Sequence, residues 1–425
     1  MRPLTDNPVT SPEGDSFHFG PYVDVLHAAV EQATPLPLTV GVFGSWGAGK
    51  SSFLRLWERR FEAGKTRTIW FNPWKYDRKV EVWAALLHTI LAEMEQEETL
   101  KEKAVRLAKA ATWLSVRAGL GTAAALGTGG VIKREDVDEL LQGLSEGDAE
   151  QYRQVNRFEA DFADAVREFV GADGRLVVFV DDLDRCTPES AMTVLESLKL
   201  YLAQAQCIFV LALDVDVLAA IATNKFGEAL KGAPAEVASG MAYLDKIVQL
   251  PFFLPDVGFD TLREAFKPYV SELADDPFFW ELLQRGLGSN PRRLKRYINV
   301  FNMALAVARG QLPPGAIDRR YSLQLAVLLI IRTLHRGFYH TLTVEPDSWL
   351  TLTRFFEQAQ TNATIRQTAS LQLPPYLHDV ATDSVLERLL THNGQERLSP
   401  PDGPAVRQMI STLRSTAGPV DPEES

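Results

Sequence analysis

The chain has 425 residues, of which 46% are hydrophobic and 23% are charged, as is typical of a folded globular protein. A net charge of −11 argues against whole-surface electrostatic binding of nucleic acid, although a local basic patch is compatible with it. Because Cys186 and Cys207 are the two cysteines, the sequence excludes a disulfide framework and a four-cysteine metal site.

We interpret residues 1–37 as a lead-in that carries one helix. Four apolar residues at helical spacing make one face of it: Val23, Leu26, Ala29 and Val30. Residues 1–17 lack the apolar core of a secretion signal, so we expect a cytoplasmic protein.

A phosphate-binding pattern, Gly-x-x-x-x-Gly-Lys-Ser, occupies residues 44–51. An apolar run at 38–43 predicts a buried strand before it, and 52–61 predicts a helix after it, which is the order that the motif requires. Glycines let backbone N–H groups turn towards a phosphate, and the helix adds its positive end. Lys50 can reach the outer phosphates, and the Ser51 hydroxyl can bind Mg²⁺. The expected nucleotide-binding residues are Gly44, Ser45, Trp46, Gly47, Ala48, Gly49, Lys50, Ser51 and Ser52. A glycine-rich turn without a ligand is the alternative.

An unusual segment, Asn72-Pro-Trp-Lys-Tyr76, follows a strand-like run at 67–71 and precedes a helical pattern over 80–98. We expect Trp74 and Tyr76 to be core anchors rather than nucleotide contacts. Asn72 could contact the water that attacks the nucleotide.

Residues 99–160 are charged at both ends and rich in Gly and Ala in the middle, so we interpret them as a helical insertion in the core domain. Within them, residues 110–132 carry one charge, Arg117. Their longest uncharged run, 118–132, is shorter than the roughly 20 residues that a membrane-spanning helix needs. We favour a soluble helix with a glycine-rich turn; membrane contact through 110–132 is the alternative.

Two acidic residues follow the apolar strand expected at 175–180. The carboxyl end of a parallel strand delivers the next side chains to the nucleotide edge of the sheet. We therefore expect Asp181 to bind Mg²⁺, directly or through water, and Asp182 to orient or deprotonate the attacking water. A surface turn rich in aspartate is the alternative. Thr187 and Pro188 then predict the start of a helix.

The wholly apolar run 207–213 predicts another buried strand, and it ends at Asp214. Alternation of strands and helices indicates a parallel sheet, so Asp214 could lie at the same edge and sense the γ-phosphate. It could equally cap the residues that follow it.

Helical patterns dominate residues 256–400, which we interpret as a helical lid or partner domain behind a core at 1–255. Residues 401–425 are rich in Pro, Gly, Ser and Asp, and we expect a disordered tail there, apart from a short helix around Met409.

A basic segment near residue 290 is the best supply of positive charge for the γ-phosphate. Pro291 suits the first position of a helix with Asn290 as its cap, which places Arg292 and Arg293 in the first turn. The helix dipole disfavours cations there, and this misfit suggests an anionic target. A solvated basic face is the rival interpretation, and Arg185 is a second candidate. Both cis and trans action of an arginine stay open.

The sequence resembles the KAP family of P-loop NTPases. The matching segments are residues 41–52, residues 71–76 with Trp83, the string Val-Asp-Asp-Leu-Asp-Arg-Cys at 180–186, residues 243–252, and the Asn-Pro-Arg-Arg of 290–293. The resemblance implies an α/β P-loop core with a parallel sheet of the additional-strand type, a C-terminal helical domain, and ATP and Mg²⁺ as ligands. Bacterial members are often linked with phage exclusion and mobile elements. Many carry membrane-spanning hairpins between the phosphate loop and the acidic strand, for which 99–160 is too short and too polar here. Asn72-Pro replaces the more usual Asn-Ala.

Together these features predict a Mg-dependent ATPase that acts as a conformational switch or assembly device, in phage defence or in signalling. Its expected partners are ATP and a protein bound by the helical domain, with a homo-oligomer and nucleic acid as further options. A nucleotide-stabilised scaffold with little turnover is the main alternative. A small-molecule phosphotransferase ranks below both, because the sequence carries no second dedicated substrate motif.

Overall fold

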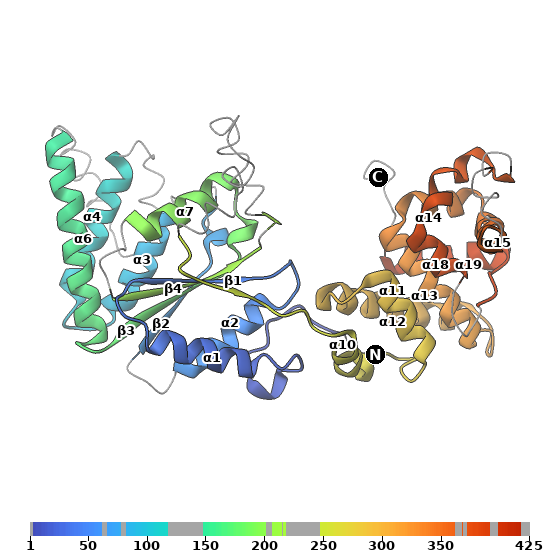
Figure 1. Ribbon diagram of the computed structural model, residues 1–425, viewed down its shortest axis with the longest axis horizontal. Helices are drawn as coiled ribbons and strands as arrows, with labels where there is room; N and C mark the ends of the chain where they lie inside the picture. Colours follow the sequence, from blue (N-terminus) through green and yellow to red (C-terminus); the bar gives the residue numbers. More distant parts are fainter. Residues whose placement is uncertain are drawn as a thin grey trace. The chain divides into compact units, whose positions relative to one another are not determined.

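A computed structural model of the chain describes residues 3–61, 66–77, 82–117, 148–200, 206–214, 216–217, 247–361, 368, 372–391 and 398–417. The chain divides into two units (Figure 1). One comprises Pro8–Pro255, and the other joins Met1–Asn7 to Asp256–Ser425. The core that we expected over 1–255 therefore begins at Pro8, because the first residues make their hydrogen bonds within the second unit.

The first unit is built on a five-stranded sheet in which all neighbouring strands are parallel, in the order β2-β3-β4-β1-β5. The strands are β1 (Leu38–Phe43), β2 (Thr66–Phe71), β3 (Arg175–Val180), β4 (Cys207–Leu213) and β5 (Leu250–Phe253). The apolar runs at 38–43, 175–180 and 207–213 are β1, β3 and β4 with the predicted bounds. Because β4 separates β1 from β3, the sheet has the additional-strand topology, and the predicted α/β fold class is confirmed.

Helices cover both faces of this sheet (Figure 1). The helices described in this unit are α1 (Gly20–Glu31), α2 (Lys50–Glu58), α3 (Val82–Glu95), α4 (Lys101–Arg117), α6 (Asp148–Val170) and α7 (Pro188–Leu200). Successive side chains of β3 point to opposite faces of the sheet, so the strand contributes to the apolar core on each face. Phe179 packs against Trp57 of α2, whereas Val178 and Val180 belong to the core under α3 and α7.

Where it is described, the insertion contributes α4 and the start of α6, which pack against each other, and α4 packs on α3. Their contact is apolar, with Ala104 and Leu107 of α4 and Phe158 and Phe162 of α6 buried. Among the described residues, no helix is long and apolar enough to span a membrane. Most of the 110–132 segment lies outside the described residues.

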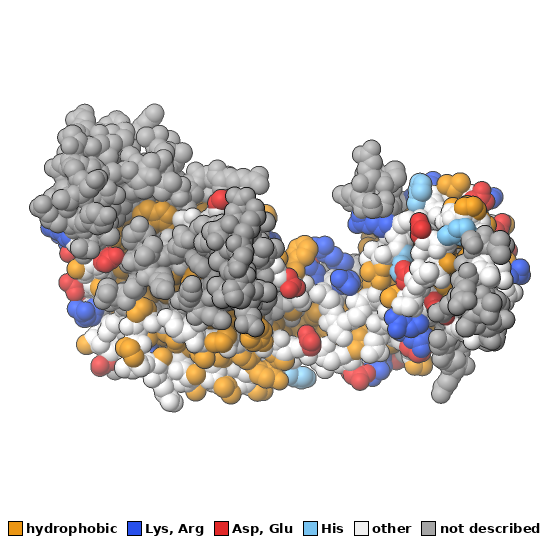
Figure 2. Space-filling model, turned by 45° about the horizontal axis from the view of Figure 1, so that its top comes forward, with side chains coloured by type: hydrophobic (Ala, Val, Ile, Leu, Met, Phe, Trp, Pro, Cys, Tyr) orange, Lys and Arg blue, Asp and Glu red, His pale blue; other side chains and the backbone are white. Residues whose placement is uncertain are grey.

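The second unit is helical where it is described, as the sequence predicts. Its helices are α10 (Phe259–Phe266), α11 (Pro277–Leu287), α12 (Pro291–Gln311), α13 (Arg319–Leu334), α14 (Arg336–Val344), α15 (Ser348–Thr361), α18 (Ser384–Thr391) and α19 (Gly403–Ala417). Charges of both signs are interspersed over the face of this unit that Figure 2 shows.

The short helix expected around Met409 is α19, and its length, Gly403–Ala417, corrects the prediction of a disordered tail over these residues. Its buried residues recur at helical spacing, namely Val406, Met409, Ile410 and Leu413, and they pack against α12. The Asp402 carboxylate accepts a hydrogen bond from the Ala405 N–H and so caps the helix start. We had weighed the Pro, Gly and Ser content above this apolar periodicity. Residues 418–425 lie outside the described residues.

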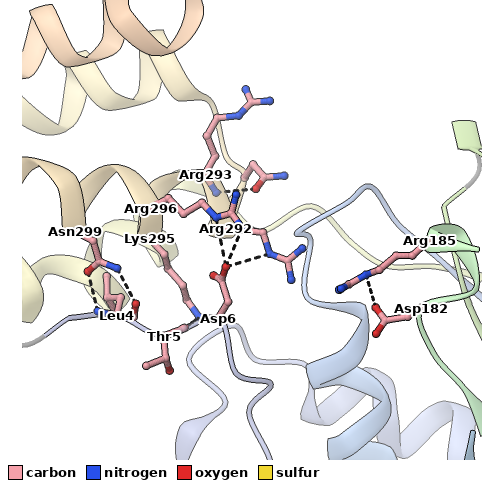
Figure 3. A network of polar contacts seen from close by, with 11 residues as sticks. Leu4, Thr5, Asp6, Asp182, Arg185, Arg292, Arg293, Lys295, Arg296 and Asn299 are labelled. Atoms are coloured by element: carbon pink, nitrogen blue, oxygen red, sulfur yellow. Dashed lines mark hydrogen bonds and ion pairs between the residues drawn. The ribbon is translucent and has the colours of Figure 1, made fainter. Parts of the chain in front are cut away.

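A short N-terminal arm, Leu4 to Asp6, is fixed to α12 (Figure 3). The Asn299 amide donates to the Leu4 carbonyl at 2.7 Å and accepts from the Leu4 N–H at 2.8 Å. Lys295 donates to the Thr5 carbonyl at 3.2 Å. These contacts, made to backbone groups, explain why the start of the chain belongs to the second unit.

Candidate functional site

The phosphate loop runs from the end of β1 to the start of α2, as the motif predicts. Gly47 and Gly49 have φ angles of 88° and 109°, which side-chain-bearing residues rarely adopt. A Cβ atom at Gly49 would also lie 3.1 Å from the Phe19 ring. The Gly44 N–H donates to the Leu213 carbonyl at 3.1 Å, which ties the start of the loop to the end of β4.

Lys50 is 7% exposed, and its ammonium group is held inside the loop. It donates to the Gly44 carbonyl at 2.8 Å and to the Ser45 carbonyl at 3.3 Å. It also lies 3.5 Å from the carboxylate of Asp184, whose side chain is 8% exposed. A buried ammonium needs such partners, and outer phosphates of a nucleotide would supply the same negative charge.

Asp181 and Ser51, the two residues predicted to bind Mg²⁺, are in direct contact. The Ser51 hydroxyl donates a hydrogen bond to the buried Asp181 carboxylate. Burial raises the pKa of Asp181, and the charges of Asp182 and Asp184 raise it further, against the opposing effect of hydrogen bonds from Ser51 and the Asp182 N–H. A carboxylate and a hydroxyl side by side are oxygen donors of the kind Mg²⁺ prefers, with phosphate oxygens and water completing its shell. The donor set fits the metal.

Asp182 is fixed from two sides. It adopts the left-handed conformation, with φ 62°. The Asn72 amide donates to its Oδ2 at 2.8 Å. Arg185 Nε lies 2.7 Å from its Oδ1 (Figure 3). Asn72 follows β2 directly, so the end of that strand positions the acid at the end of β3. We had considered Asn72 for the attacking water, and that contact stays a prediction, because Asp182 occupies the Asn72 amide N–H and not its buried Oδ1.

Trp74 is 52% exposed, so the prediction of a core anchor is wrong for this residue. It lies in the 3₁₀ turn Pro73–Lys75, where Pro73 takes the buried position. The Arg185 guanidinium lies over the indole, 5.2 Å from the ring centroid. Tyr76, by contrast, is partly buried and stacks on Phe71.

Asp214 is buried at the same edge of the sheet, one residue after the Leu213 carbonyl that binds the phosphate loop. Its carboxylate accepts a hydrogen bond from the Asp216 N–H at 3.1 Å, which is the capping contact that we considered. The role of a γ-phosphate sensor stays a prediction.

Two other residues of the predicted binding set show different environments. The Ser52 hydroxyl accepts a hydrogen bond from the Val9 N–H at 3.0 Å, which joins α2 to the chain that enters the first unit. Trp46, in the middle of the loop, is 58% exposed. Their contacts with a nucleotide stay predictions.

Arg292 and Arg293 belong to the second unit, in the first turn of α12. As predicted, Pro291 begins this helix and the Asn290 side chain caps it by accepting from the Arg293 N–H. Arg292 Nε lies 3.8 Å from the Asp6 carboxylate, and Arg293 donates to the Leu287 carbonyl at 3.4 Å. Their catalytic role stays a prediction.

Sequence reasoning missed three contacts that hold this site together. They are the pairing of Lys50 with Asp184, that of Asn72 with Asp182, and a hydrogen bond that the Thr187 N–H donates to the Asp77 carboxylate at 3.2 Å. The first two join segments that the sequence already singled out, and Asp77 directly follows one of them. The clustering of polar residues directly after β2 and β3 was the available signal.

The KAP family P-loop domain matches this chain over residues 19–308, which is more than half of its length. No curated protein matches significantly. Among solved structures, the ORC2 protein of Aeropyrum pernix in its ADPNP-ADP complexes shares 14% identity over 98% of both chains, with a TM-score of 0.32. The ORC1 protein of the same organism, in complex with DNA, shares 13% identity over 96% of this chain and 94% of its own, with a TM-score of 0.35. Both superpositions are loose.

Proposed function

The chain belongs to the KAP family of P-loop domains, and on this basis we propose that it binds ATP with Mg²⁺ and hydrolyses it. Membership of a P-loop NTPase family supports nucleotide binding and hydrolysis in general. The choice of ATP, the Mg²⁺ requirement and the use of turnover as a conformational switch are our proposals.

One observation supports the proposal above the others. Lys50 and Ser51 on the phosphate loop contact Asp184 and Asp181 after β3, although more than a hundred residues separate the two segments. The phosphate-binding cation and the candidate metal ligands therefore share one site. Had they been turned towards separate sites, the proposal would have failed.

Each residue then has a physical task. Main-chain N–H groups of the loop and the N-terminus of α2 bind the phosphates, and Lys50 neutralises their outer charge. Ser51 and Asp181 would hold Mg²⁺, which would neutralise part of the phosphate charge. Asp182 orients the attacking water, and Asn72 fixes the direction of its carboxylate.

The test of binding is Lys50→Ala. We expect the variant to lose most of its affinity for Mg-ATP in a fluorescent-nucleotide titration. Lys103→Ala is the matched control, because Lys103 makes a partly exposed ion pair with Glu168 on the insertion. Equal affinities of Lys50→Ala and wild type would refute the site.

The test of chemistry is Asp182→Ala. Loss of a positioned general base lowers turnover by about 10²–10⁴-fold. Affinity for ATP, measured on the same preparation, should stay within about threefold of wild type, because the phosphates are bound elsewhere. Undiminished phosphate release by this variant would exclude Asp182 from the chemistry.

A scaffold with little turnover is the second candidate, and one observation favours it: Asn72 and Arg185 engage both carboxylate oxygens of Asp182. Purified protein that holds ATP for hours without releasing phosphate would support the scaffold. We further propose that the helical second unit binds a protein partner and that ATP controls this binding. The implied role in phage defence or signalling stays a prediction.

A further inference from the structure

The contacts of the Arg185 side chain are weak enough for a bound anion to replace them. Its Nε lies 2.7 Å from Asp182 Oδ1, and its guanidinium lies over the half-exposed indole of Trp74. The Arg185 side chain is itself 34% exposed. An ion pair and a cation–π contact at such exposure are weak in water, so a multiply charged anion can compete for the guanidinium.

Arg185 also lies in the right segment. It ends the 3₁₀ turn Leu183–Arg185, directly after Asp184, whose carboxylate pairs with Lys50. The turn thus carries one side chain to the phosphate-loop lysine and the next to the acid that orients water. Arg185 belongs to the same unit as the phosphate loop, whereas Arg292 and Arg293 belong to the other unit.

We propose that Arg185 is the residue that binds the γ-phosphate from within the same chain, and that it leaves Asp182 for this phosphate when a triphosphate binds. The inference rests on the proposed function, because it needs a triphosphate on the phosphate loop. A planar guanidinium can donate two parallel hydrogen bonds to two oxygens of a phosphate. In the present structure it contacts one oxygen of Asp182, Oδ1.

The exchange has two effects that act together. The guanidinium stabilises the charge on the γ-phosphoryl oxygens as the bond to the leaving oxygen breaks. Departure of Arg185 also frees Oδ1 of Asp182 to accept a hydrogen bond from the attacking water, while Asn72 still holds Oδ2. Without a γ-phosphate, Arg185 returns to Asp182 and Trp74. The contacts of Asn72 and Arg185 with Asp182, which favour a scaffold, then belong to the nucleotide-free or ADP-bound state of an ATPase.

The first experiment compares Arg185→Ala, Arg185→Lys and a matched control, Arg67→Ala. Arg67 makes the same two kinds of contact at another part of the sheet, an ion pair with Glu97 at 2.8 Å and a position over the Phe169 ring at 5.2 Å. We expect Arg185→Ala to lower kcat at least 100-fold and to weaken ATP binding at least fivefold. ADP binding should change less than twofold, Arg185→Lys should restore part of kcat, and Arg67→Ala should match wild type.

Two outcomes would overturn the proposal. Unchanged or raised kcat in Arg185→Ala would make Arg185 only a restraint on Asp182. Equal loss of ATP and ADP affinity would make it only a support of the turn.

Trp74 provides a second readout that needs no turnover. In a Trp46→Phe background, which removes the indole in the phosphate loop, we expect a non-hydrolysable ATP analogue to change tryptophan emission and ADP to change it much less. Trp74→Phe and Arg185→Ala should each remove the difference. If both nucleotides bind but Trp74 does not distinguish them, the exchange is refuted and the proposed function stands. If wild-type protein binds neither nucleotide, the proposed function itself fails, and this inference fails with it.

Discussion

The buried pair of Lys50 and Asp184 predicts that removal of one charge destabilises the nucleotide-free protein more than the nucleotide-bound one. In Asp184→Asn the side chain keeps its shape but loses its charge. The Lys50 ammonium then stays buried with the Gly44 and Ser45 carbonyls as its remaining observed partners. Bound phosphates would replace the lost charge.

The magnitude follows from the burial of both partners. Removing one member of a buried ion pair costs about 3–5 kcal/mol. The two carbonyls offset part of this, and so does the loss of repulsion between Asp184 and Asp181. A loss of about 2 kcal/mol in the free energy of unfolding is the resulting expectation. For a unit of roughly 250 residues, that lowers the melting temperature by about 4–8 °C.

Thermal unfolding with and without saturating Mg-ATP measures both effects. The variant should melt below wild type without nucleotide and close to wild type with nucleotide. Adding Mg-ATP should therefore raise the melting temperature of the variant more than that of wild type. Asp164→Asn is the control, because its pair with Arg167 is well exposed and should contribute less than about 1 kcal/mol. Equal gains in Asp184→Asn and wild type would show that phosphates do not take the place of Asp184.

Three further variants test other parts of the structure. Gly49→Ala should lose about 1–3 kcal/mol in urea unfolding, because of its φ of 109° and the nearby Phe19 ring. Gly310→Ala is the control and should not lose stability, because a Cβ at Gly310 would meet open space. Equal losses of stability in the two variants would contradict the role given to the φ angle and the Phe19 ring. Burial lowers the pKa of His88 to about 4. Between pH 6.5 and 4 the imidazole is therefore protonated in the unfolded state but neutral in the native state. Stability should therefore fall by roughly 3 kcal/mol between pH 6.5 and 4, and His88→Leu should flatten this profile measured by urea unfolding. Asn299→Ala should cost about 1–2 kcal/mol and speed hydrogen exchange at the N-terminus; unchanged exchange would dismiss the arm contacts.

The sheet could be predicted from the sequence because strands buried on both faces read as continuous apolar runs. Residues 38–43, 175–180 and 207–213 carry this signal within their own length. The short strand β5 does not, since its alternating exposure and its proline weaken the pattern over only four residues. It is a strand because it pairs with β1, which no local pattern encodes.

The functional site was predictable in its residues but not in its pairings. Asp181 and Ser51 could be placed together because Asp181 directly follows β3, and Ser51 follows the loop that leaves the end of β1 in the same parallel sheet. Asp184 and Asn72 belong to the motifs at 180–186 and 71–76, yet their partners depend on how separate turns meet in space. Trp74 was misjudged for a related reason, since hydrophobicity alone does not say which side of a turn faces solvent.

The hydrogen bonds between the N-terminal arm and α12 affect how this protein can be divided. A fragment that begins at Asp256 leaves behind the residues that occupy the polar groups of Lys295 and Asn299. The complementary fragment, if it starts at Met1, carries an arm without its binding surface. Cloning the helical unit for partner screening therefore calls for a gene in which the first seven codons are joined to codon 256 through a flexible linker instead of being discarded.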